Sequence, residues 1–138
     1  MNYLLDTNVV SEGRKPRPDP NVVAWLTSVS SSDMFVSTMV IGELRRGVEM
    51  LHRRDLQRAT ALDQWLQELL NEYADRILPV TVEIAQEWGR MNVPDLLPAV
   101  DAILAATAKI HRMTLVTRDT GRLAQYGVTI LNPFEPIR

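Results

Sequence analysis

Short apolar runs alternate along this chain with longer segments in which apolar side chains recur at helical spacing. The apolar runs predict strands, and they cover residues 3–5, 34–37, 77–80, 113–117 and 128–131. The segments of helical period predict helices at 40–51, 62–73, 82–91 and 99–110. This alternation is typical of βαβ units, so we expect an α/β fold with a central, mainly parallel sheet of four to five strands.

The helical patterns also predict how each helix faces the core. In 40–51, Val40, Leu44 and Val48 form an apolar stripe, and Glu43 projects beside it. The charged residues 52–55 join this helix to the next, which predicts a hairpin of two helices. In 82–91 we expect Ala85 and Trp88 inside. For 99–110 we expect four core-facing positions: Val100, Ile103, Thr107 and Ile110.

Length and composition fit an ordinary folded domain. The 138 residues suffice for one compact domain, expected to span 1–138, and the chain is 46% hydrophobic and 23% charged. It has no cysteine, which excludes disulfides, thiolate zinc sites and thiol nucleophiles. No stretch approaches the roughly 18 to 20 apolar residues needed to cross a bilayer, and the N-terminus lacks the order of a secretory signal. We therefore expect a cytoplasmic protein without a membrane partner.

The basic residues are mostly arginines in local groups. The net charge of −2 decides nothing about a polyanionic partner, but Arg45 with Arg46 and Arg53 with Arg54 stand next to each other. The planar guanidinium donates two parallel hydrogen bonds to phosphate, so such groups suit a phosphate-bearing partner. For any one arginine, a solvated surface charge or an ion pair within the chain is an equally good explanation.

Four acidic residues occupy positions from which their carboxylates can converge. Asp6 and Asp119 each follow an apolar strand, and open parallel sheets bind ligands at the carboxyl ends of their strands. Glu43 and Asp101 lie early in helices whose starts are expected near the same edge. Such a cluster repels itself unless a cation neutralises it, and oxygen ligands favour Mg²⁺ or Mn²⁺. One or two such ions, with an activated water, would cleave phosphodiesters.

Each acid taken alone has a simpler explanation. Asp6 and Asp119 would serve as N-caps, and Asp101 would complement the dipole of its helix.

Trp25, Trp65 and Trp88 are candidates for the core or for an interface, and we favour the core because a small domain needs large apolar side chains.

Three stretches together favour a shared acidic site over separate capping roles for the acids, because they resemble the motifs of one family in the right order. LLDTNVVSE at 4–12, STMVIGELRRGVEML at 37–51 and VDAILAATAKIHRMTLVTRD at 100–119 are similar to PIN-domain ribonuclease toxins of the VapC type, in the FitB-like branch. The resemblance spans nearly the whole chain. It implies that Asp6, Glu43 and Asp101 are catalytic, metal-ligating acids, that Asn8 supports Asp6, and that Thr117 lies beside the cluster.

The last of these motifs departs from the family pattern. Relatives often carry TRN followed three residues later by an acid, whereas here Asp119 stands at the Asn position and Arg122 at the later one. We take Asp119 as the fourth catalytic and metal-site acid.

The resemblance further implies a three-layer α/β/α fold and a metal-dependent endoribonuclease, the toxin component of a type II toxin–antitoxin system. The expected partners are an RNA substrate, a second copy of the chain in a homodimer, and a cognate antitoxin whose C-terminal segment occludes the site. Arg45, Arg46, Arg112 and Arg118 are candidates to steer the RNA backbone.

Two other classes remain open at this point. In a haloacid dehalogenase-like phosphohydrolase, Asp6 would be a covalent nucleophile, but that chemistry expects a second Asp where Asn8 stands. In a non-catalytic interaction or phosphoacceptor module, the acids would bind Mg²⁺ only to organise a surface. Receiver domains of that kind need a Lys near the sheet edge, and neither Lys15 nor Lys109 follows a predicted strand.

Overall fold

A five-stranded parallel sheet forms the centre of the computed structural model, which describes residues 1–121 and 123–136. The strands lie in the order β3-β2-β1-β4-β5, and every neighbouring pair is parallel. They are β1 (Tyr3–Leu5), β2 (Met34–Ser37), β3 (Ile77–Leu78), β4 (Thr114–Val116) and β5 (Ile130–Leu131). The chain builds the sheet outward from β1 on one side and then returns to the other, so the strand order reverses between β1 and β4.

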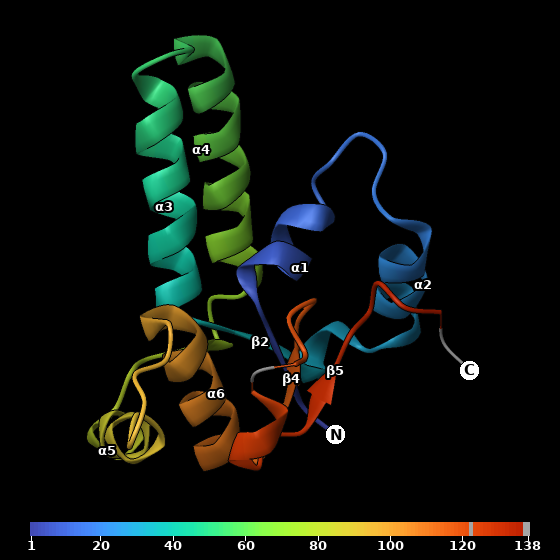
Figure 1. Ribbon diagram of the computed structural model, residues 1–138. Helices are drawn as coiled ribbons and strands as arrows, with labels where there is room; N and C mark the ends of the chain where they lie inside the picture. The colour runs from blue at the N-terminus through green and yellow to red at the C-terminus, as the bar shows by residue number, and fades with distance from the viewer. Residues whose placement is uncertain (122, 137–138) are drawn as a thin grey trace.

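Helices cover the sheet in a three-layer α/β/α arrangement. They are α1 (Thr7–Glu12), α2 (Pro20–Ser28), α3 (Thr38–His52), α4 (Leu56–Glu72), α5 (Val82–Met91) and α6 (Ala99–His111), with 3₁₀ turns at Ser31–Asp33 and Ala124–Tyr126. In Figure 1, α5 and α6 lie on one side of the sheet and α2 on the other. The hairpin of α3 and α4 projects beyond the sheet. None of the helices within the described ranges is long and apolar enough to cross a membrane.

The hairpin forms because its two helices are capped at their starts and share an apolar stripe. The Ser37 side chain accepts a hydrogen bond from the Met39 backbone N–H (3.0 Å), and the Asp55 carboxylate accepts one from Arg58 N (3.1 Å). Val40, Leu44 and Val48 are buried on α3, as the period predicts. The predicted hairpin is confirmed.

The central position of β1 buries two of its three side chains almost completely. Leu4 and Leu5 are 0% and 1% exposed, and they belong to one hydrophobic cluster that takes residues from both halves of the sheet. Burying such a side chain stabilises the fold by roughly 1.5–3 kcal/mol. The residue that follows β1 therefore starts from a rigid position.

The structure corrects several boundaries and faces. The strand predicted at 77–80 ends at Leu78, because Pro79 has no N–H to continue the ladder. The strands predicted at 113–117 and 128–131 pair only over Thr114–Val116 and Ile130–Leu131. Ala85 is exposed and Ile84 is buried instead, because a single stripe of α5 packs on α6.

Of the four core-facing positions predicted on α6, Thr107 is buried, Val100 and Ile103 pack against the core while partly buried, and only Ile110 is wrong. This helix packs against α3, α5 and β4 at once, so its buried surface is broad and consists largely of alanines that allow close approach. Val100 and Ile103 lie half-buried at its edge, and Ile110 is 36% exposed.

Two helices were not predicted at all. Helix α1 has six residues, too few for a periodic pattern. Helix α2 carried a usable signal, because Asp19 precedes Pro20 and its carboxylate accepts hydrogen bonds from Asn21 N (2.8 Å) and Val22 N (3.3 Å). Trp25 on α2 is 4% exposed and lies in the core, as expected, whereas Trp65 and Trp88 are half-buried.

Candidate active site

Asp6 lies at the carboxyl end of the central strand, where the strand order reverses. Its backbone N–H donates to the carbonyl of Val116 on β4 (2.9 Å), which holds the ends of the two strands together. Its side chain is only 8% exposed. Ligands of open α/β sheets bind outside this kind of switch point. The location predicted for the site therefore coincides with the switch point of this sheet.

Three donors hold the Asp6 carboxylate. Oδ1 accepts the Thr7 backbone N–H (2.7 Å) and thereby caps α1, as the simpler explanation of this residue predicts. Oδ2 accepts the Thr117 hydroxyl (2.7 Å) and the Asn8 side-chain amide (3.4 Å). Asp6 therefore acts as a helix cap and as the centre of a polar network at once.

Glu43 joins this network through a threonine. The Thr7 hydroxyl donates to Glu43 Oε1 across the junction of α1 and α3 (2.5 Å). Two of the four predicted acids are thus linked through Thr7. Its backbone N–H donates to Asp6, and its hydroxyl donates to Glu43. Thr7 itself is not among the residues predicted for the site.

The segment after β4 closes the network from the other strand. Asp119 N donates to the Thr117 hydroxyl oxygen (3.1 Å), and Arg118 N donates to the Asn8 side-chain oxygen (3.5 Å). The predicted supporting residues Asn8 and Thr117 therefore contact Asp6 and the 118–119 backbone. The Asp119 carboxylate is exposed and caps no helix within the described ranges, and Arg122, at the later motif position, lies outside them.

Asp101 lies in the first turn of α6, half-buried. Helix α6 packs against α3, and Figure 1 shows its first turn near the start of α3. In residues 1–121 and 123–136, no group of three or more His, Asp or Glu side chains is close enough to hold an ion by itself. The meeting of Asp101 and Asp119 with Asp6 and Glu43 stays a prediction.

The donors that do meet fit a hard divalent cation. They are carboxylate and hydroxyl oxygens, and each carboxylate oxygen of Asp6 keeps lone-pair capacity beyond the hydrogen bonds it accepts. Mg²⁺ is usually held by one or two protein carboxylates, with waters and substrate phosphates completing its shell. Asp6 and Glu43, which share Thr7 as a hydrogen-bond partner, are our candidates to supply those carboxylates.

The predicted arginines differ in what they contact. Arg45 pairs with Asp63 on α4 (2.9 Å) and with Glu49 (3.8 Å). The hydrogen bond between Arg45 and Asp63 lowers the pKa of the Asp63 carboxyl and raises the pKa of Arg45. Arg45 thus links the two helices of the hairpin. Arg46 is exposed, and Arg118 lies beside the acid network with its guanidinium 3.7 Å from the Phe134 ring centroid.

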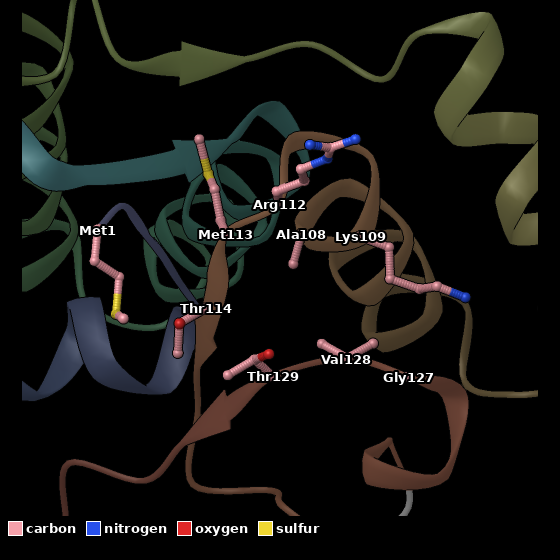
Figure 2. A pocket seen from close by; sticks show the side chains of 9 residues that line it. All are labelled: Met1, Ala108, Lys109, Arg112, Met113, Thr114, Gly127, Val128 and Thr129. Atoms are coloured by element: carbon pink, nitrogen blue, oxygen red, sulfur yellow. The ribbon is translucent and has the colours of Figure 1, made fainter.

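Arg112 lies at the far end of α6. It follows the last helical residue, His111, about 16 Å along the helix from Asp101. Figure 2 shows it at the rim of a separate hollow of about 390 Å³ at the amino ends of β4 and β5. The neighbouring Lys109 pairs with Glu87 (3.2 Å). Of the four arginines, Arg118 is the one connected to the Asp6 network.

Glu12 is a further residue that the sequence did not single out. It is 5% exposed and accepts hydrogen bonds from Lys15 Nζ (2.8 Å) and Asp19 N (2.9 Å), while Arg118 lies 3.9 Å away. The Lys15 hydrogen bond, with that of the Asp19 N–H, lowers the pKa of the Glu12 carboxyl. Glu12 therefore fixes the loop after α1 and ties it to the 118–119 segment.

With this geometry in place, comparison with known proteins identifies the class. The PIN domain profile matches residues 3–128, and the chain belongs to the PIN-domain family. It is 37% identical to Toxin FitB from Neisseria gonorrhoeae, over 95% of this chain and 97% of that protein. It is 31% identical to VapC ribonuclease Y4jK from Sinorhizobium fredii, over 96% and 98%.

A solved structure agrees over the same length. The crystal structure of FitAcB from Neisseria gonorrhoeae superposes with a TM-score of 0.86 at 36% sequence identity, covering 96% of this chain and 98% of that chain. The fold and the family expected from the three sequence motifs are confirmed.

Proposed function

We propose that this chain is a metal-dependent endoribonuclease and the toxin of a type II toxin–antitoxin pair, acting in the cytoplasm as a single domain. The observation that carries the proposal is the buried Asp6 carboxylate at the β1/β4 switch point, held by Thr117 and linked through Thr7 to Glu43. The names of its relatives, a toxin and a ribonuclease, support it.

The proposed roles of the residues follow from their positions. Asp6 and Glu43, with Asp101 and Asp119 approaching from α6 and the 118–119 segment, hold one or two Mg²⁺ or Mn²⁺ ions. The bound ion supplies a Lewis acid for the RNA phosphate and lowers the pKa of a water. Thr117 and Asn8 orient the Asp6 carboxylate, and Arg118 donates to the RNA backbone beside it.

The proposed partners are those of a neutralised toxin. A homodimer binds a cognate antitoxin, whose C-terminal segment occludes the acidic site. A basic side chain on that segment is attracted to Asp6 and Glu43 and competes with the ion for the same oxygens.

The test is cleavage of a panel of labelled single-stranded RNAs by the purified chain, with Mn²⁺, with Mg²⁺ and with EDTA. We expect internal cuts that need the cation and that disappear in Asp6→Asn. Asp75→Asn is the matched control, because this carboxylate is 86% exposed and pairs only with its neighbour Arg76 among the described residues. Cleavage that survives in EDTA or in a folded Asp6→Asn protein would refute the assignment.

A second readout does not depend on activity. Mn²⁺ bound to the folded protein raises its melting temperature by mass action, and this increase should be lost in Asp6→Asn and kept in Asp75→Asn. An equal increase in all three proteins would place the ion elsewhere.

A further inference from the structure

A small groove opens directly beside the acid network, between α1, the loop after it and the α3–α4 hairpin. It has a volume of about 260 Å³, and its lining includes Thr7, Ser11, Arg14, Lys15, Glu43 and Trp65. We call it the Trp65 groove. Thr7 and Glu43 belong both to this groove and to the acid network, so the two form one continuous surface.

The side chains of the Trp65 groove combine an aromatic face with positive charge. The Arg14 guanidinium lies 5.6 Å from the centroid of the Trp65 ring. Within the described part of the chain Arg14 has no carboxylate partner, whereas Lys15 is held by Glu12. Cations lying over tryptophan are common, but here the cation is exposed and the ring half-buried, which leaves both accessible from the groove.

An aromatic ring with adjacent cations is how proteins hold single-stranded nucleic acid. The base stacks on the ring, whichever base it is, and the cations contact the backbone phosphate. The groove is smaller than the roughly 300–1,000 Å³ typical of small-molecule sites, which suits one nucleotide. A basic antitoxin segment fits less well, because Arg14 and Lys15 repel it.

We propose that the Trp65 groove binds one nucleotide of the RNA next to the cleaved bond, with its base on Trp65 and its phosphate on Arg14 and Lys15. This subsite rests on the proposed ribonuclease function and adds to it the residues that position the strand. Glu43, at the boundary between groove and acid network, marks the side on which the scissile phosphate lies.

The first experiment measures RNA affinity by fluorescence anisotropy in EDTA, and KM and kcat of cleavage in Mn²⁺. Trp65→Ala should weaken binding about 5- to 100-fold and raise KM, with a smaller change in kcat, whereas Trp65→Phe keeps a ring and should retain most of the affinity. Arg14→Gln should reduce the slope of log affinity against log salt concentration by about 0.7. Arg54→Gln is the matched control, because Arg54 is an exposed arginine at the tip of the hairpin. It should change neither the affinity for RNA nor the slope of log affinity against log salt concentration.

A change in the RNA tests the same contact without altering the protein. An abasic nucleotide is moved along the cleaved RNA, and one position next to the cut should lose affinity with the wild-type protein. The same abasic RNA should lose nothing further with Trp65→Ala, because the base and the ring form one interaction.

A blocking variant avoids the risk that Trp65→Ala fails to fold. A Cβ built at Gly47 meets nothing within 4 Å, so Gly47→Gln fills the groove while keeping α3 intact. It should raise KM as Trp65→Ala does, at unchanged or higher thermal stability.

The outcomes separate the two proposals. If the wild-type chain neither binds nor cuts RNA, the proposed function fails and the subsite fails with it. If the wild type cuts RNA but Trp65→Ala and Gly47→Gln keep its KM and the abasic scan is flat, only the subsite is refuted. If these variants weaken antitoxin binding and leave RNA binding unchanged, the groove is a protein interface and our inference is wrong.

Discussion

The hydrogen bond from the Thr117 hydroxyl to Asp6 is where a single substitution tests the site most directly. Thr117 is 1% exposed and donates to Asp6 Oδ2 over 2.7 Å. Thr117→Val keeps the shape of the side chain but removes this donor, and it also removes the acceptor of the Asp119 N–H. Hydrogen bonds to charged groups contribute about 1.5–3 kcal/mol, so we expect the free energy of unfolding to fall by about 2 kcal/mol.

A loss of this size is readily measured in a domain whose total stability is about 5–15 kcal/mol. Urea titrations followed by tryptophan fluorescence give the free energy of unfolding, and the melting temperature should fall by about 6–8 °C. RNA cleavage should fall at least tenfold, because Asp6 loses the group that orients it. Thr117→Ser retains the hydroxyl and should restore most of both quantities.

Thr114→Val is the matched control on the same strand. Thr114 is also nearly buried, but in residues 1–121 and 123–136 its hydroxyl makes no hydrogen bond, and it lines the hollow shown in Figure 2. If Thr117→Val and Thr114→Val unfold with the same free energy, the Thr117 hydroxyl does not hold Asp6 and our reasoning is refuted. In an Asp6→Asn background the cost of Thr117→Val should shrink by about 1 kcal/mol, because the acceptor is no longer charged.

Two further predictions concern residues around the site. Glu12→Gln should be less stable than the wild type at neutral pH. Because the pKa of Glu12 is lowered in the folded state, its charge stabilises the fold above its ordinary pKa of 4.5, and this effect is lost as pH falls through the lower pKa of the folded state. In urea titrations, the difference in free energy of unfolding between the wild type and Glu12→Gln should therefore narrow below pH 4.5. A difference that stays constant with pH would contradict this prediction. Arg45→Ala should cost less than about 1 kcal/mol, as expected for an exposed pair with Asp63, and should leave the salt dependence of RNA binding unchanged; a flatter dependence in binding assays would restore Arg45 as an RNA contact.

The sequence predicted the parts of the fold that depend on periodicity. The hairpin of α3 and α4 and the helix Val82–Met91 follow from apolar spacing, and the parallel sheet follows from alternation. Periodicity did not predict the full buried surface of α6, which packs on several neighbours at once. The alanine surface of α6 could not be distinguished from a solvated one, because alanine satisfies either environment.

The site was predictable in its acids and less so in its connections. Asp6 and Glu43 stood out through motif resemblance, but Thr7, which links them, is an uncharged residue that nothing in the pattern singled out. Glu12 ended a motif without an assigned role, since a buried acid with three partners depends on residues from the following loop and from beyond β4. Such contacts join distant positions and leave no local periodic pattern.

The pairing of β1 with β4 also decides when the network around Asp6 can form during synthesis. The Asp6 partner Thr117 lies 111 positions later in the chain, so during synthesis Asp6 leaves the ribosome well before its hydroxyl donor. Until Thr114–Val116 joins the sheet, one edge of β1 is bare and Asp6 lacks its hydroxyl donor. The polar network around Asp6 is therefore completed only after β4 has been made and has paired with β1, and under the proposed function no RNA would be cut before that point.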